Sequence, residues 1–317
     1  MKILVTSTSF QDTPGNHHSL LKSKKCNVDF MRGPLTESEL LNIIEKYDGI
    51  ICGDDDYSSD VLEKGFKAKL RVISKYGVGL DKIDLDTAKK LNIVVKNCPG
   101  INRNSVAEHV LALLLCYSKN IHLQYNLVQK GSWKRISGEE IKNKTIGIIG
   151  LGAIGREVAL KCSALGLKVY AYDLKKDIKF FKLNPKIYFV EDLVDIYNNC
   201  EIISLHVPYN KSTANMINVD TINNLMTKKP IIINTARGKL VDSKAIVDGI
   251  ENNKIKAYLC DVLDVEPIQE NQILRGQKNI IITPHIGSRT IQNVENQATM
   301  AIDNLFKEFD RLNLKTT

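Results

Sequence analysis

Short runs that are apolar on both faces limit the fold of this 317-residue chain more than any other feature. Residues 231–233 and 280–282, each three consecutive isoleucines, are examples. Strands of this kind need helices over both faces of their sheet, as in parallel α/β proteins. The full set of expected strands, in which these two runs are slightly longer, is residues 2–6, 49–52, 70–74, 93–96, 145–150, 168–172, 201–207, 230–235, 256–262 and 279–283.

Segments with helical spacing separate most of these runs. They include residues 35–46, 105–119, 154–165, 219–226, 242–252 and a final helix at about 290–311. This alternation predicts an α/β fold with doubly wound parallel sheets, and at about 150 residues per domain the length predicts two domains. A turn at residues 97–100 marks the predicted boundary, and we expect Ser105 to cap the helix that follows.

Composition excludes several classes of protein. The net charge is +8, from 44 Lys and Arg against 36 Asp and Glu, and 43% of the residues are hydrophobic, which excludes a largely disordered chain. The lysines are dispersed, so we expect no nucleic-acid partner. No apolar run is long enough for a membrane span or an export signal, so we expect neither.

Cysteine and histidine usage predicts a cytoplasmic protein without a metal site. The seven cysteines are an odd number and contain no Cys-x-x-Cys pair, which is typical of a reducing compartment and argues against zinc. We expect His17 and His18 to lie in a surface turn, and His109 to pack in a helix interface.

A glycine-rich turn indicates a dinucleotide site. Residues 150–155 read G-x-G-x-x-G between an expected strand and an expected helix. Gly150 permits the tight turn, Gly152 lets the backbone approach a pyrophosphate, and Gly155 lets helix and strand pack closely. The amides at the helix N-terminus would bind the phosphates.

Asp173 ends the next expected strand, 18 residues after Gly155. A carboxylate there can accept both adenosine ribose hydroxyls and would repel a 2′-phosphate, which favours NAD over NADP. Lys175 and Lys176 follow closely and weaken this preference.

Three ionisable residues follow late strands, at the sheet edge where ligands bind in such folds: Arg237, Glu266 and His285. Arg237 can bind a carboxylate through two parallel hydrogen bonds. His285 can return or remove a hydroxyl proton near neutral pH, and a nearby Glu266 would raise its pKa. These groups suit hydride transfer between a nicotinamide cofactor and a 2-hydroxy acid.

The chain resembles the D-isomer-specific 2-hydroxyacid dehydrogenases, especially the D-3-phosphoglycerate dehydrogenase-like branch, from about residue 45 to about residue 300. The motifs that carry the resemblance are residues 75–84 (KYGVGLDKID), 99–102 (PGIN), 105–108 (SVAE), 150–158 (GLGAIGREV), 205–208 (LHVP), 234–238 (NTARG), 261–262 with 266–267, and 284–287 (PHIG).

The resemblance implies two Rossmann-like domains with a cleft between them. Residues 1–98 with 288–317 would form a flavodoxin-like substrate domain, and residues 99–287 the NAD-binding domain. A homodimer through the NAD-binding domains is usual in the family. In a departure from the related phosphoglycerate dehydrogenases, the sequence stops after the final expected helix, so we expect no carboxyl-terminal regulatory domain.

The resemblance also implies individual roles. Arg237, Glu266 and His285 would be catalytic, with Gly77 and Gly79 offering amides to the substrate carboxylate. The substrate-binding set would be Lys75, Tyr76, Gly77, Val78, Gly79, Asn102, Arg237 and His285. Asp261 would hold the nicotinamide carboxamide. The cofactor-binding set would be Gly150, Gly152, Ala153, Ile154, Gly155, Asp173, His206, Val207, Pro208, Thr235, Ala236, Arg237, Asp261, His285 and Gly287.

One departure leaves the substrate open. Residues 52–56 carry Asp54, Asp55 and Asp56 where related phosphoglycerate dehydrogenases often have an arginine, and three aspartates would repel a phosphate. Lys75 retains some cationic capacity. Glyoxylate or hydroxypyruvate reductase and D-lactate dehydrogenase are therefore alternatives, and a non-enzymatic NAD-sensing corepressor is an alternative of another class.

Overall fold

The computed structural model describes residues 1–314 and contains two compact units. Unit 1 comprises Met1–Asn102 and the segment from Ser288 onward, and unit 2 comprises Arg103–Gly287. The chain first passes from unit 1 to unit 2 after Asn102, rather than near residue 98 as predicted. The boundary lies later because Cys98 and Ile101 pack in the hydrophobic core of unit 1.

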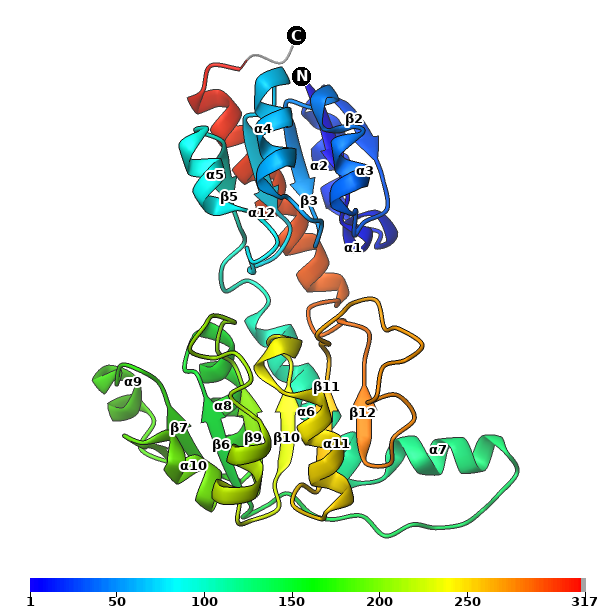
Figure 1. Cartoon of the computed structure of the whole chain (residues 1–317), viewed down its shortest axis with the longest axis vertical. Coiled ribbons are helices and arrows are strands. Elements are labelled where there is room, and N and C mark those ends of the chain that lie inside the picture. The colour runs from blue at the N-terminus through cyan, green and yellow to red at the C-terminus, as the bar shows by residue number, and fades with distance from the viewer. Residues whose placement is uncertain (315–317) are drawn as a thin grey trace. The chain divides into compact units, whose positions relative to one another are not determined.

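Unit 1 is a five-stranded parallel sheet in the order β2-β1-β3-β4-β5 (Figure 1). Its strands are β1 (Lys2–Val5), β2 (Asn27–Phe30), β3 (Gly49–Cys52), β4 (Val72–Lys75) and β5 (Val94–Lys96). One face packs on α1 (Thr8–Asp12), α2 (Asn16–Ser23) and α12 (Ile291–Arg311). The other packs on α3 (Glu37–Leu41), the short helix Ile44–Lys46, α4 (Ser59–Ala68) and α5 (Leu85–Lys90).

Unit 2 is a seven-stranded parallel sheet in the order β12-β11-β10-β9-β6-β7-β8, the doubly wound order of dinucleotide-binding folds. Its strands are β6 (Thr145–Ile149), β7 (Lys168–Tyr172), β8 (Ile187–Phe189), β9 (Ile202–Leu205), β10 (Ile231–Asn234), β11 (Ala257–Cys260) and β12 (Ile280–Ile282). Parallel α/β sheets in both units confirm the predicted fold class.

Helices cover both faces of the unit 2 sheet, as the two-faced strands require. Ile231 and Ile233 lie in the core beneath α6 (Arg103–Ser118), α8 (Ala153–Ala164) and α9 (Ile178–Leu183). Ile232 between them lies in the opposite core, beneath α10 (Leu193–Asn199), the π-helix η2 (Thr221–Leu225) and α11 (Ser243–Glu251).

Three local predictions are wrong. The helix expected from Ser105 begins at Arg103, so Ser105 lies inside α6. Its hydroxyl donates to the Gly287 carbonyl instead of capping the helix. The segment expected as one helix over 35–46 is broken at Asn42 into two short helices. His17 and His18 lie in α2 rather than in a turn, and His17 is fully buried beside the Phe10 ring.

β2 and β8 were not expected from the sequence. Each is an edge strand with exposed positions, Asn27 and Phe30 in β2 and Tyr188 in β8, so neither shows the two-faced apolar pattern. Among residues 1–314, no helix has both the length and the apolar character to cross a membrane.

Candidate active site

The predicted site residues of unit 2 lie after the carboxyl ends of its strands. The glycine turn follows β6, Asp173 follows β7, and His206 follows β9. Arg237, Glu266 and His285 follow β10, β11 and β12, which are neighbours in the sheet (Figure 1). Because all these strands are parallel, their carboxyl ends meet at one edge, where ligands bind in such sheets.

The glycine turn has the shape of a phosphate cradle. Gly150 has φ +97, and a Cβ there would lie 2.6 Å from the carbonyl oxygen of His206. Gly155 packs so closely on the Gly150 carbonyl that any side chain would collide with it. A Cβ on Gly152, by contrast, would meet no atom within 4 Å, so this glycine borders open space.

α8 begins directly at this turn, at Ala153. Its N-cap residue, Gly152, has no side chain to accept the hydrogen bonds of the first-turn amides. Those amides and the positive end of the helix dipole are therefore available to an anion. The residues present fit the pyrophosphate of a dinucleotide.

Asp173 is tied to the same turn. Its Oδ2 accepts a hydrogen bond of 2.6 Å from the Leu151 amide, which fixes the carboxylate beside the glycines. Lys176, which follows it, pairs with Glu191 at 3.7 Å and stacks over the Phe189 ring. This pairing reduces the cationic charge that could attract a 2′-phosphate near Asp173.

Two further polar residues line this edge of the sheet. The Thr235 hydroxyl is buried and has no hydrogen-bond partner among residues 1–314, so it is suited to a ligand atom. His206 Nε2 lies 2.8 Å from the Ser204 hydroxyl. Desolvation lowers the pKa of His206 to about 4, although part of the residue remains accessible. His206 is therefore neutral and adds no charge beside the turn.

Arg237 stands on a turn that Asn234 organises. The buried Asn234 amide donates to the Arg237 carbonyl at 2.9 Å and to the Tyr258 hydroxyl at 3.2 Å, and its Oδ1 accepts from the Ala236 amide at 3.1 Å. The Arg237 guanidinium donates to the Ala236 carbonyl at 2.7 Å. The sequence motif at residues 234–238 contains Asn234 but does not reveal its role in holding the turn, because this role depends on the fold of the turn.

Gly238 brings the Arg237 turn against the loop that carries Glu266. A Cβ on Gly238 would collide with the backbone at Leu263 and Asp264, so only glycine allows this approach. Within that loop, Glu266 Oε1 accepts a hydrogen bond of 2.8 Å from the Leu263 amide. The backbone of the loop therefore holds the Glu266 carboxylate in place independently of any partner side chain.

His285 and Glu266 form a close pair. His285 Nδ1 lies 2.7 Å from Glu266 Oε2, and both side chains are more than a third exposed. An imidazole held at Nδ1 presents Nε2 on the opposite edge of its ring. The structure thus brings together the histidine and the carboxylate whose pairing the sequence predicted.

The Asp261 carboxylate accepts hydrogen bonds from other residues of unit 2. Its carboxylate is 2% exposed and accepts hydrogen bonds from the Thr283 hydroxyl and from the amides of Ile286 and Gly287. Burial alone would raise the pKa of Asp261, but hydrogen bonds from His109, Thr283 and the two amides lower it below its usual value. Its contact with a carboxamide remains a prediction.

The substrate-binding residues predicted in unit 1 lie at and just after the end of β4, except Asn102, which follows β5. Lys75 is buried, and its Nζ lies 2.5 Å from Asp54 Oδ1 and 2.5 Å from the Gly53 carbonyl. Gly77 has φ +144, a conformation that favours glycine. The Val78 carbonyl accepts from Asn97, and the buried Asn102 Oδ1 has no hydrogen-bond partner in the described part of the chain. The substrate contacts of Lys75, Tyr76, Gly77, Val78, Gly79 and Asn102 remain predictions.

The three aspartates after β3 have different partners, and their expected repulsion of a phosphate remains a prediction. Asp54 pairs with Lys75, while Asp56 pairs with Lys82 at 2.7 Å. Asp55 is fully buried, accepts from the Thr6 hydroxyl and the Leu35 amide, and burial raises its pKa. Asp54 is therefore the aspartate that offsets the charge of Lys75.

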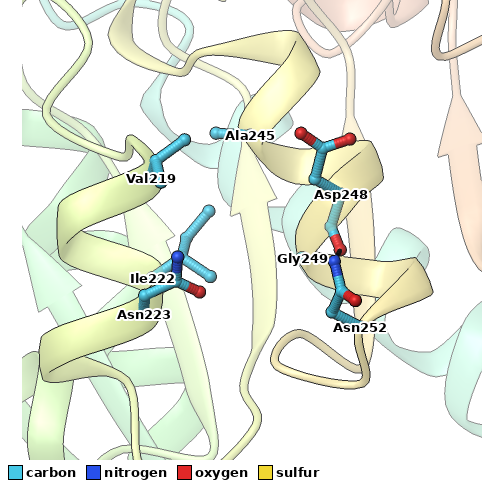
Figure 2. A pocket seen from close by; sticks show the side chains of 7 residues that line it. All are labelled: Val219, Ile222, Asn223, Ala245, Asp248, Gly249 and Asn252. Atoms are coloured by element: carbon cyan, nitrogen blue, oxygen red, sulfur yellow. Dashed lines mark hydrogen bonds between the residues drawn. The ribbon is translucent and has the colours of Figure 1, made fainter.

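A pocket of about 170 Å³ lies elsewhere in unit 2, between η2 and α11 (Figure 2). Its polar lining is the Asp248 carboxylate and the amides of Asn223 and Asn252, and Asn252 donates to the Asp248 carbonyl at 2.9 Å. The predicted site residues do not line it.

Comparison with known proteins gives the family. Residues 111–287 match the model of the D-isomer specific 2-hydroxyacid dehydrogenase NAD-binding domain. The chain is 34% identical to a hydroxypyruvate reductase of Thermotoga maritima, over 86% of this chain and 89% of that protein. It is also 34% identical to a D-3-phosphoglycerate dehydrogenase of Methanocaldococcus jannaschii, over 97% of this chain but 57% of that longer protein.

A solved structure agrees with this placement. D-lactate dehydrogenase from Lactobacillus jensenii, determined with NAD⁺, is similar with a TM-score of 0.72 and 30% identity, over 96% of each chain. The predicted family, oxidoreductase class and NAD cofactor are confirmed at the level of the family. The chain belongs to the D-isomer-specific 2-hydroxyacid dehydrogenases.

Proposed function

We propose that Arg237, Glu266 and His285 interconvert a D-2-hydroxy acid and its 2-oxo acid. The observation that carries this proposal is the 2.7 Å pair between His285 and Glu266. These two residues follow β12 and β11, and β11 lies beside β10, which Arg237 follows. Arg237 would bind the substrate carboxylate through two parallel N–H donors. NADH, when bound, supplies the hydride for the carbonyl carbon.

His285 would move the proton. In reduction, its Nε2–H donates to the substrate carbonyl oxygen as that oxygen becomes a hydroxyl. In oxidation, neutral Nε2 takes the hydroxyl proton back. Glu266, which holds Nδ1, stabilises the charged imidazolium in both directions.

The cofactor would lie along the carboxyl edge of the unit 2 sheet. We assign its pyrophosphate to the glycine turn and the α8 N-terminus, and its adenosine ribose to Asp173. The buried Thr235 hydroxyl supports a further contact at the end of β10. The contacts of Ile154, His206, Val207, Pro208 and Ala236 belong to the same proposal.

The substrate would be a small 2-oxo acid without a phosphate. Lys75 is buried, and its charge is already offset by Asp54, which weakens its attraction for a second anion. Hydroxypyruvate and glyoxylate fit this requirement better than 3-phosphohydroxypyruvate.

The direct test is a screen of NADH oxidation with hydroxypyruvate, glyoxylate, pyruvate and 3-phosphohydroxypyruvate. We expect the highest kcat/KM with one of the first three compounds. Preference for 3-phosphohydroxypyruvate would overturn the assignment of substrate but not of reaction. Tight NADH binding without turnover of any 2-oxo acid would overturn the enzymatic proposal in favour of an NAD-sensing binding protein.

We also propose a homodimer through the NAD-binding unit. Figure 1 shows α7 (Ile121–Gln129) standing away from the sheet of unit 2, followed by an extended segment. None of the α7 residues is buried, and Tyr125 and Trp133 are 64% and 81% exposed. Apolar surface of this kind marks an interface, and a second copy of this chain would cover it.

The compartment is proposed to be the cytoplasm. All seven cysteines are free thiols, and five of them, Cys52, Cys98, Cys162, Cys200 and Cys260, are buried as small apolar side chains in the cores of the two units. Unpaired thiols of this kind are typical of a reducing compartment.

A further inference from the structure

Two polar side chains of α6 reach the turn that carries His285. The Ser105 hydroxyl donates to the Gly287 carbonyl at 2.7 Å. His109 Nε2 lies 2.9 Å from the Thr283 hydroxyl and 3.3 Å from Asp261 Oδ1. Ser105 and His109 are four residues apart, so they lie on the same face of the helix. They therefore contact the two sides of one turn.

The protons in this cluster can be assigned. Because the hydrogen bonds around Asp261 lower its pKa, the carboxyl is ionised and can only accept. The Thr283 hydroxyl donates its single proton to Asp261 Oδ1 at 2.6 Å. Its oxygen must therefore accept from His109, whose Nε2 carries a proton. His109 is thus a donor to the cluster.

The turn itself needs such support. His285 has φ +53, in the left-handed region that residues with a Cβ rarely adopt because of steric strain. The next two amides, of Ile286 and Gly287, donate to the two oxygens of Asp261 at 2.9 and 2.7 Å. A Cβ on Gly287 would lie 3.0 Å from Asp261 Oδ2 and 3.4 Å from the His109 ring.

We propose that His109 and Ser105 are positioning residues for His285, acting on its turn through Asp261, Thr283 and Gly287. This inference rests on the proposed role of His285 as the acid and base. The hydrogen bonds from α6 hold the Thr283 side chain before His285 and the Gly287 carbonyl after it, and the turn between them carries the ring that lies 2.7 Å from Glu266. His109, which the sequence indicated as a packing residue, would therefore control the geometry of proton transfer without touching the substrate.

The test compares four variants. His109→Leu removes the donor with little loss of volume, and His109→Gln retains an N–H at a similar reach. Ser105→Ala removes the second anchor, and Ser118→Ala is its matched control, because both serines lie on α6 and are almost equally buried, at 6% and 7% exposed. Two quantities are measured: kcat for the best 2-oxo acid, and the pKa of His285 in the cofactor-free protein by NMR titration.

In His109→Leu we expect kcat to fall about ten- to a hundredfold, as for a misplaced catalytic group, with little change in the dissociation constant of NADH. The loosened turn weakens the Glu266 contact, so the pKa of His285 should also fall. His109→Gln should restore most of both quantities. Ser105→Ala should lower kcat by a smaller factor, and Ser118→Ala should leave it unchanged.

Unchanged kcat and an unchanged His285 pKa in His109→Leu would overturn the proposal. So would a His109→Gln variant no better than His109→Leu, because the role would then be packing. If His109→Leu does not fold, the comparison of Ser105→Ala with Ser118→Ala decides. The NMR titration needs no turnover, so it separates failure of this inference from failure of the proposed reaction.

Discussion

Glu266 Oε2 lies 2.7 Å from His285 Nδ1, and the other oxygen of the same carboxylate accepts the Leu263 amide. Replacing Glu266 with Gln keeps the shape but removes the charge that stabilises the imidazolium, so the pKa of His285 should fall. Reduction needs the protonated His285 ring, so its rate should begin to fall at a lower pH in the variant than in the unmodified protein. Oxidation needs the neutral ring, so its acid limb should also move to lower pH. A pH–rate profile in each direction measures both limbs.

Asp264→Asn is the matched control for this change. Asp264 lies two residues away in the same loop, and its Oδ1 accepts from Gln272 at 2.9 Å rather than from His285. Its profile should follow the unmodified protein. If Glu266→Gln left both limbs in place and Asp264→Asn moved them, the proton relay would have to be assigned to Asp264.

Arg237→Lys should keep the positive charge but lose the planar pair of donors. We expect kcat/KM for the 2-oxo acid to fall at least about a hundredfold, since a charged hydrogen-bond clamp contributes about 2–4 kcal/mol. NADH binding, measured by fluorescence, should change far less. Arg275→Lys, at an exposed position of unit 2, is the control. Normal activity in Arg237→Lys would remove this residue from the site.

Asp173→Ala should relax the preference for NADH over NADPH. The carboxylate, fixed at 2.6 Å from the Leu151 amide, would repel a 2′-phosphate and is lost in the variant. The ratio of kcat/KM for the two cofactors measures the effect. Equal values in the unmodified protein would show that Asp173 does not select the cofactor.

Much of the architecture follows from local pattern. Strands such as β10, apolar on both faces, can be stable only between two layers of helices, which predicts both parallel sheets. β2 and β8 could not be predicted because exposed positions, such as Asn27 and Tyr188, interrupt the apolar pattern of these short strands. Arg237, Glu266 and His285 could be identified because the ends of parallel strands share one edge, wherever the chain runs between them.

Contacts between distant segments could not be predicted in the same way. His109 and Thr283 are 174 residues apart, and their hydrogen bond depends on the rotation of α6 about its axis and on a left-handed residue in the facing turn. The pairing of Lys75 with Asp54, rather than with Asp55 or Asp56, likewise depends on which aspartate side chain the loop buries. Neither property has a periodic signature in the sequence.

Tyr125→Asp should disrupt the proposed dimer. The side chain is 64% exposed on α7, and a charge placed within an apolar interface would have to be desolvated. We expect the variant to sediment as a monomer at micromolar concentration. Tyr188→Asp is the matched control, because Tyr188 is 54% exposed on the edge strand β8 of the same unit. Identical sedimentation of Tyr125→Asp and the unmodified protein would place the interface elsewhere.

His206 should make the stability of the protein depend on pH. Desolvation lowers its pKa to about 4, against an ordinary value of 6.5 that applies in the unfolded chain. Between these two values the unfolded chain binds more protons than the folded one, so the free energy of unfolding falls as pH falls through this window. His206→Asn removes this component while retaining a polar partner for Ser204. Urea unfolding at pH 7.5 and at pH 5 should therefore show a smaller loss of stability in the variant than in the unmodified protein. An equal loss in both proteins would mean that the imidazole titrates in the folded state as it does in the unfolded chain, and that it can carry a positive charge beside the glycine turn.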